Sequence, residues 1–159
     1  MKIHNKYQGL VTKKFNEFYL VELTQNENKK FLCTLRKSLK FKKQIVYVGD
    51  EVILRQIDLK SKRAIIESLV QRKNFLERPS VANISNIYVL CSVEEPKLNL
   101  SQVNSFLISA EQIGVEVSLV LTKCDLIKEE QRLLLIDKFK KWGYKVITLN
   151  LNHQENFSK

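Results

Sequence analysis

The sequence contains few glycines, and none of them opens a phosphate-binding loop. Its four glycines are Gly9, Gly49, Gly114 and Gly143. None is followed by the Lys-Ser or Lys-Thr pair that ends the pattern G-x-x-x-x-G-K-[ST]. Without that loop and its lysine, a phosphoryl-transfer site has nothing to hold the β- and γ-phosphates of a nucleotide. The 159-residue sequence therefore contains no phosphate loop of that pattern.

Cysteine and histidine are also scarce, which argues against a metal centre. Cys33, Cys91 and Cys124 are far apart and form no C-x-x-C pair, while His4 and His153 stand near opposite ends. We expect no metal site within this chain, and we expect Cys33 and Cys91 to be small buried hydrophobes. No apolar run is long enough to span a membrane, and the N-terminus leads into no signal region. The expected location is the cytoplasm, with no membrane partner.

The positive charge is distributed unevenly along the chain. The net charge is +10, and residues 1–80 carry 18 Lys and Arg against 8 Asp and Glu. Residues 81–159 carry 9 against 9, so the first half holds all of the excess. Such asymmetry favours a polyanionic partner for the first half, with nucleic acid ahead of an acidic membrane surface. The alternative is a basic face that only keeps the protein soluble.

The first half has the pattern of a small β-barrel. Short runs of β-forming residues are separated by charged turns, and the first two flank a turn expected at Lys13–Asn16. The expected strands are Tyr7–Lys14, Phe18–Leu23, Lys30–Arg36, Glu51–Ile57 and Arg63–Val70. Five such strands indicate a barrel of the OB type, a fold that commonly binds oligonucleotides.

Two groups of side chains on this barrel are candidates for binding RNA. The basic candidates, expected in loops where they would contact phosphates, are Lys13, Lys14, Lys40, Lys42, Lys43, Lys60, Lys62 and Arg63. The aromatic candidates for stacking on bases are Tyr7, Phe18, Tyr19 and Phe31. Because a small barrel must also fill its core, we expect most of these aromatics to be buried.

From residue 84 the pattern changes to alternating strands and helices. The expected elements are Ile87–Cys91 (strand), Ser101–Ile113 (helix), Val117–Leu121 (strand), Glu129–Trp142 (helix) and Val146–Leu149 (strand). This β-α-β-α-β order predicts a parallel sheet with right-handed crossovers. The predicted domains are residues 1–71, an OB-fold RNA-binding domain, and residues 84–159, an incomplete parallel α/β domain. Residues 72–83, which lack clean periodicity, are predicted to link the two.

A polar turn follows the buried strand of the second half. Thr122-Lys123-Cys124-Asp125 resembles the [Asn/Thr]-Lys-x-Asp guanine-specificity motif of GTPases. A carboxylate can accept hydrogen bonds from guanine N1–H and the 2-amino group together, and adenine offers no such pair of donors. Two simpler readings stay open: Asp125 could cap the following helix, and Lys123 could be a solvated loop lysine. The position at the carboxyl end of a parallel strand favours a ligand site.

The order of the two halves makes a specific resemblance visible. Between them lies Arg72-Lys73-Asn74-Phe75-Leu76-x-Arg78-Pro79-x-Val81-Ala82-Asn83, and the Thr-Lys-x-Asp turn follows. Together these features resemble the ribosome small-subunit-dependent GTPases of the RsgA family, which are circularly permuted. The likeness covers nearly the whole chain. It implies an N-terminal OB-type barrel followed by an incomplete P-loop GTPase-like α/β domain.

The resemblance also implies a function and a set of contacts. The barrel would bind ribosomal RNA on the small (30S) subunit, and the complete protein, a monomer, would hydrolyse GTP with Mg²⁺ during late subunit maturation. Thr122, Lys123, Cys124 and Asp125 would form the guanine site, with Asp125 on the guanine edge and Lys123 along the base and ribose. Thr122 stands where many GTPases have Asn, which weakens its expected contact with the base. Zinc is implied only for a C-terminal domain.

In the family, the phosphate loop, the switches and the zinc domain follow the third strand. This chain ends soon after that strand, so we expect a truncated GTPase with no catalytic residue of its own and no hydrolysis by this chain alone. Two alternatives remain at this point. One is a non-catalytic ribosome-associated RNA-binding protein, and the other is an unrelated barrel and α/β domain in which Thr122–Asp125 is only a turn.

Overall fold

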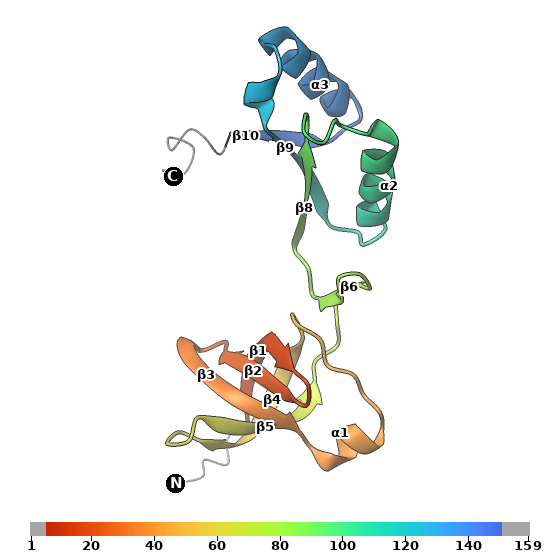
Figure 1. Ribbon diagram of the computed structural model, residues 1–159. Coiled ribbons are helices and arrows are strands. Elements are labelled where there is room, and N and C mark those ends of the chain that lie inside the picture. The colour runs from red at the N-terminus through yellow and green to blue at the C-terminus, as the bar shows by residue number, and fades with distance from the viewer. Residues whose placement is uncertain (1–5, 151–159) are drawn as a thin grey trace. The chain divides into compact units, whose positions relative to one another are not determined.

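A computed structural model describes residues 6–150 of the chain. It divides the chain into two compact units, Met1–Ile84 and Ser85–Lys159 (Figure 1). None of the helices in the described part is long and apolar enough to cross a membrane.

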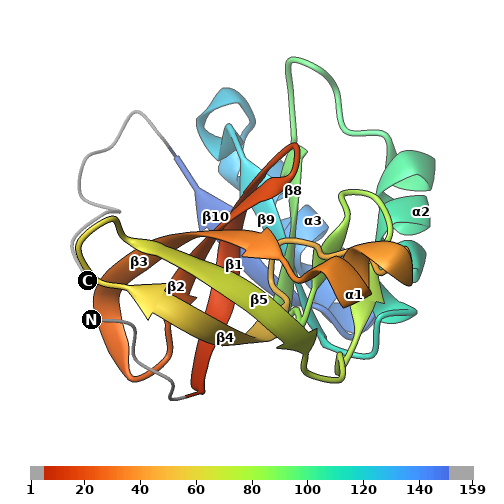
Figure 2. The same cartoon turned by 90° about the horizontal axis from the view of Figure 1, so that it is seen from below.

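The first unit is a closed five-stranded barrel in the order β1-β2-β3-β5-β4 (Figure 2). Its elements are β1 (Tyr7–Phe15), β2 (Phe18–Leu23), β3 (Asn26–Leu35), α1 (Lys37–Phe41), β4 (Glu51–Asp58) and β5 (Arg63–Leu69). β1 closes the barrel by antiparallel pairing with β4, and β3 and β5 are parallel. The predicted OB-type barrel is confirmed.

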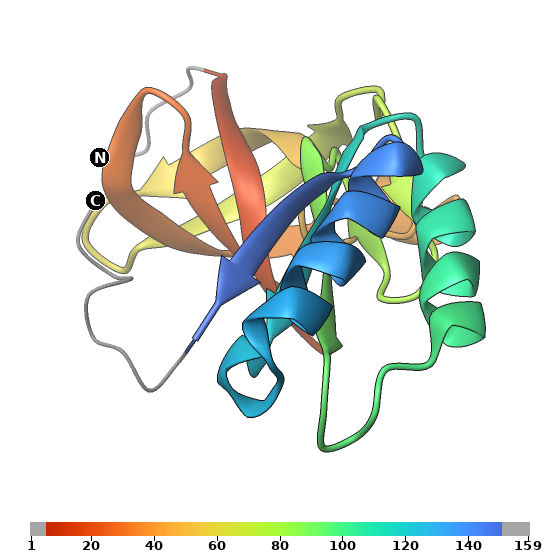
Figure 3. The same ribbon diagram turned by 90° about the horizontal axis from the view of Figure 1, so that it is seen from above.

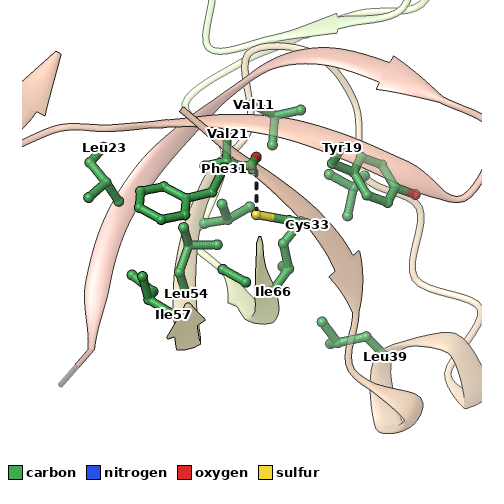
Figure 4. Close-up of a cluster of buried hydrophobic side chains, with 13 residues drawn as sticks. Val11, Tyr19, Val21, Leu23, Phe31, Cys33, Leu39, Leu54, Ile57 and Ile66 are labelled. Carbon is green, nitrogen blue, oxygen red and sulfur yellow. Dashed lines mark hydrogen bonds between the residues drawn. The ribbon is translucent and has the colours of Figure 1, made fainter. Parts of the chain in front are cut away.

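The barrel core follows from the alternation of apolar residues along the strands. Val11, Val21 and Cys33 are completely buried, and Phe31 is 2% exposed (Figure 4). Because successive side chains of a strand point to opposite faces, one residue in two is directed inward, and closure removes those residues from water. The expectation that Cys33 is a buried hydrophobe is confirmed.

Two local expectations for the barrel are wrong. The turn between β1 and β2 lies at Asn16 and Glu17, so Lys13 and Lys14 belong to the strand and not to a loop. β1 shifts its register against β2 between Val11 and Lys13 and then continues to Phe15, inside the expected turn. The basic stretch after β3 forms the helix α1, because Leu39 packs into the core and fixes one side of it.

Residues 71–84, which we call the anchored segment, hold specific contacts with the barrel. Arg72 forms a bidentate ion pair with Asp50, whose side chain is completely buried. Arg72 Nε lies 2.6 Å from Asp50 Oδ1, and Arg72 Nη2 lies 2.9 Å from Asp50 Oδ2. Hydrogen bonding to Asp50 raises the pKa of Arg72. Arg72 also donates to the Ile45 carbonyl at 2.9 Å and lies over the rings of Tyr47 and Phe75.

Two asparagines complete the anchored segment. Asn74 donates to the Ile84 carbonyl at 2.8 Å and accepts from the Ile84 N–H at 2.7 Å. Asn83 accepts from the Lys73 N–H and donates to the Gly49 carbonyl, both at 2.8 Å. A side chain at Gly49, where φ is +86°, would collide with the Ala82 carbonyl. The short strands β6 (Phe75–Leu76) and β7 (Val81–Ala82) pair within this segment. The predicted linker therefore carries a defined structure of its own.

The second unit is a parallel sheet in the order β10-β9-β8 (Figure 3). Its elements are β8 (Asn86–Ser92), α2 (Leu100–Glu111), β9 (Glu116–Thr122), the 3-10 turn η1 (Cys124–Leu126), α3 (Glu129–Lys141) and β10 (Lys145–Leu149). The Asn99 side chain caps α2 by accepting from the Gln102 N–H at 3.2 Å. The predicted parallel α/β arrangement is confirmed.

Both helices pack on one face of this sheet. Val89, Leu119 and Val146 lie in register on the three strands and join a cluster with Leu107 of α2 and Phe139 of α3. β9 is the central strand, and Ser118–Leu121 are all buried, as the apolar run predicts. The neighbouring strands and both helices thus hold the end of β9 in place.

Candidate functional site

The Thr122–Asp125 turn begins where β9 ends, at the carboxyl edge of the sheet. The Thr122 hydroxyl donates to the Cys91 carbonyl of β8 at 3.4 Å, and the Thr122 carbonyl accepts from the Val93 N–H at 3.1 Å. Lys123 adopts the left-handed conformation (φ 56°, ψ 34°), which turns the chain sharply out of the strand. The turn is therefore tied to the neighbouring strand on its β8 side.

The buried side chain of Cys124 anchors the turn to the core of the second unit. Its side chain is 3% exposed and packs in the cluster of the second unit, with Sγ donating to the Leu121 carbonyl at 3.5 Å. Burial raises the pKa of this thiol, so it stays protonated and unreactive near neutral pH. The side chain of Cys124 faces the core, which leaves its backbone as the part available to a ligand.

Lys123 and Asp125 are the exposed charged members of the turn. The Lys123 ammonium donates to the Glu95 carbonyl in the β8–α2 connection, and its side chain remains exposed. Asp125 lies in η1, and the N-cap residue of α3 is Lys128, so the reading of Asp125 as that N-cap is wrong. Both charges lie beside the carboxyl ends of two parallel strands, where α/β sheets bind ligands, and the guanine site there stays a prediction.

The basic candidates of the barrel are all exposed, but they lie in separate regions of it. Lys13 and Lys14 lie near the end of β1, and Lys40, Lys42 and Lys43 lie on or just after α1. Lys60 and Lys62 lie in the β4–β5 turn, at the other end of the barrel from α1 (Figure 1). We name these two regions the α1 end and the β4–β5 end.

The α1 end is held together by an ion pair across two elements. Lys40 Nζ of α1 lies 2.7 Å from Glu17 Oε2 in the β1–β2 turn. This contact lowers the pKa of Glu17. Lys14 lies over the ring of Tyr47, 5.5 Å from its centroid. Positive side chains from β1 and from α1 therefore share one end of the barrel.

Most of the four aromatic candidates are buried or packed against the core, as expected, and one is exposed. Tyr19 and Phe31 are core residues, and Tyr7 packs against the core, whereas Phe18 is 47% exposed. Phe41 of α1 is 91% exposed and was missed by sequence reasoning. The available signal was its spacing, since Phe41 follows the buried Leu39 by two positions and so leaves the face of α1 that packs inward.

Arg63 begins β5 directly after Lys62, so it adjoins the β4–β5 end and does not lie in a loop as expected; it lines a hollow on the barrel wall. The hollow has a volume of about 400 Å³ and is lined by Phe18 of β2, Thr34 of β3 and Arg63 of β5, with Gln56, Asp58 and Ser61 at its β4–β5 side. An exposed ring and a guanidinium beside one hollow suit a nucleotide, whose base stacks and whose phosphate is anionic.

A family model for RsgA GTPases matches residues 69–159. The chain belongs to the RsgA GTPase family. A small ribosomal subunit biogenesis GTPase RsgA of Prochlorococcus marinus (strain NATL2A) is 33% identical over 162 residues, covering 95% of this chain and 52% of the relative. Its namesake in Synechococcus sp. (strain CC9605) is 40% identical over 115 residues, covering 72% of this chain and 38% of the relative. The chain spans about half the length of the curated relatives that it matches.

Two solved structures share the fold of both units. YjeQ from Thermotoga maritima has a TM-score of 0.80 at 24% identity, over 92% of this chain and 52% of that chain. YloQ, titled a circularly permuted GTPase, has a TM-score of 0.82 at 23% identity, over 96% of this chain and 54% of that chain. The order of a barrel followed by a parallel α/β unit is thus a fold that this chain shares with both solved structures.

The residues of this RsgA-family chain fit only part of the ligand set that its family implies. An exposed carboxylate at the end of β9 suits the guanine edge. Between residues 6 and 150, no cluster of three or more His, Cys, Asp or Glu side chains is placed to hold a metal, and the sequence has no phosphate loop. The described residues therefore offer a carboxylate that suits a guanine base, and they include no side-chain cluster of the kind that holds a metal.

Proposed function

We propose that this chain provides the RNA-binding barrel and the guanine-recognising part of a small ribosomal subunit biogenesis GTPase. Its partners are the small (30S) subunit with its ribosomal RNA, and a guanine nucleotide. It acts in the cytoplasm as a monomer. The proposed domain limits are those of the sequence: residues 1–71 for the barrel, 72–83 for the connection, and 84–159 for the first part of the permuted GTPase domain.

The observation that carries the guanine site is the exposed Asp125 on a turn that Thr122 and Cys124 fix at the end of β9. Asp125 accepts hydrogen bonds from guanine N1–H and the 2-amino group, and Lys123 lies along the base and ribose. Thr122 and Cys124 spend their side chains on the sheet, so their role is to position the two charged residues. A carboxylate held in place by the fold discriminates more strongly than a mobile one.

Substituting Asp125→Asn is expected to change which base is bound. An amide can donate to the C2 oxygen of xanthine and accept from its N1–H, whereas it meets the guanine 2-amino group with a donor of its own. Competition against a fluorescent guanine nucleotide should show that the variant loses guanosine binding by at least about tenfold and gains xanthosine binding. Glu129→Gln, which changes an exposed carboxylate at the start of α3, is the matched control. Equal loss for both variants would contradict a specific role for Asp125.

GTP hydrolysis is expected to be absent from this chain alone. Phosphoryl transfer depends on positioning and on charge stabilisation around the phosphates, and the sequence has no phosphate loop to provide them. A turnover assay should show the same rate for the chain and for a Thr122→Ala/Asp125→Ala double variant. A rate above that of the double variant would overturn the assignment of these residues to the base-binding part only.

The barrel supplies the RNA-binding activity in this proposal. Its lysines at the α1 end and at the β4–β5 end, together with Arg63, are exposed and carry the charge that phosphates require. Support for the α1 end comes from three exposed aromatics: Phe15 ends β1, Phe18 begins β2 after the β1–β2 turn, and Phe41 ends α1. The β4–β5 turn carries the aliphatic Leu59 as its exposed apolar residue.

A further inference from the structure

Phe41 is an aromatic side chain that the barrel does not use for its own packing. It ends α1 and is 91% exposed, the highest value among the large apolar side chains described. The core contribution of α1 comes from Leu39, which is 8% exposed. A phenylalanine left this far in water gains almost nothing for the fold, since its stabilising value lies in burial.

The backbone that carries Phe41 is nevertheless held firmly. At the start of α1, the Arg36 N–H donates to the Ile66 carbonyl and the Arg36 side chain pairs with Glu67, both at 3.0 Å. At its end, the Gln44 N–H donates to the Leu39 carbonyl at 3.1 Å. Lys40 adds the ion pair with Glu17. Phe41 is therefore presented in a fixed place before any partner arrives, which limits the entropy that binding must overcome.

The charges around Phe41 are all of one sign. Residues 36–43 read Arg-Lys-Ser-Leu-Lys-Phe-Lys-Lys, with five cations and no acid. Ion pairs occupy Arg36 and Lys40. Lys37, Lys42 and Lys43 have no ion-pair partner within residues 6–150, so their charges are available to a partner. An exposed ring flanked by available cations is complementary to a base flanked by phosphates.

We propose that Phe41 stacks on an unpaired base of RNA while Lys42 and Lys43 contact the phosphates beside that base. This inference rests on the proposed RNA-binding function and names one stacking site within it. The base must be unpaired, because the faces of bases within a duplex are already covered by their neighbours. α1 has only five residues, too few to form the long apolar face with which an interfacial helix enters a lipid surface.

The test compares a single-stranded RNA oligonucleotide with the duplex that it forms with its complement, using the full chain. Phe41→Ala should weaken binding of the single strand about 5- to 150-fold and leave binding of the duplex unchanged. Phe41→Trp, which keeps a ring, should restore single-strand binding. Ile45→Ala is the matched control, because Ile45 lies in the same connection between α1 and β4 and is 54% exposed but has no ring. It should bind both RNAs as the parent does.

The possible results separate this site from the general function. If the parent chain binds neither RNA, the proposed RNA-binding function fails and this site fails with it. If the parent binds and Phe41→Ala binds equally well, or loses single strand and duplex alike, only the stacking site is overturned. If Phe41→Ala loses binding to phosphatidylserine vesicles and not to RNA, the occupant is a lipid surface and the proposal is overturned. Circular dichroism of each variant checks that α1 and the barrel are intact.

Discussion

Replacing Arg72 with methionine is expected to destabilise the barrel unit by about 3 kcal/mol, because the buried Asp50 carboxylate then loses its cation. Methionine keeps the length of the apolar stem but provides no donor. The Tyr47 N–H, 2.8 Å from Asp50 Oδ2, would remain as a partner, and one backbone donor does not compensate a buried charge. The loss of the Arg72 contact with the Ile45 carbonyl and with two aromatic rings adds to the effect.

Hydrogen exchange resolved by peptide can measure this change in each unit separately. Peptides from β1 and β4 should exchange about a hundredfold faster in the variant, while a peptide from β9 should keep its rate. Lys73→Met, which removes an exposed neighbouring charge, is the matched control and should leave all three rates unchanged. An Asp50→Asn/Arg72→Met double variant should regain much of the loss, since no buried charge remains. Identical exchange in the Arg72 and Lys73 variants would show that the ion pair is not what fixes the segment.

Reversing two charges at the α1 end is expected to have the largest effect on RNA affinity. Lys42→Glu with Lys43→Glu should lower affinity for single-stranded RNA on the order of a hundredfold at low salt, because two phosphate contacts become repulsions. The dependence of affinity on salt should also become shallower. Each lost contact removes about 0.7 from the slope of log K against log salt, so the two together remove about 1.4.

Two further pairs of substitutions serve as comparisons. A pair in the second unit controls for the change in net charge, and a pair at the β4–β5 end tests the other candidate RNA-binding surface. Lys140→Glu with Lys141→Glu makes the same change in net charge on α3 and should leave the affinity and the slope nearly unchanged. Lys60→Glu with Lys62→Glu tests the β4–β5 end and should have a smaller effect than the α1 pair. A larger effect there would move the RNA-binding surface to that end, and equal effects of all three pairs would mean that only net charge matters.

Much of the site in the second unit was accessible from the sequence. A β-branched and aliphatic run from Val117 to Leu121, interrupted only by Ser118, predicts a strand buried on both faces. The polar turn that follows must then lie at the sheet edge. What the sequence left open was whether Asp125 serves as a helix cap. α3 begins later, with Lys128 at its N-cap, and this depends on how the chain leaves the strand through the left-handed Lys123 and the buried Cys124.

For the barrel, the sequence and the tertiary structure determined different features. The sequence alone determined the five strands, the excess of positive charge and the order of a barrel before a parallel sheet, because periodicity and composition are local properties. Only the tertiary structure decided that Tyr19 and Phe31 face inward while Phe18 and Phe41 face water. It also decided that Asp50 meets Arg72, and that the lysines form two ends instead of one cluster. Alternation along a strand assigns two faces but does not say which is inside; that choice is made when β1 closes on β4 and brings distant segments into contact.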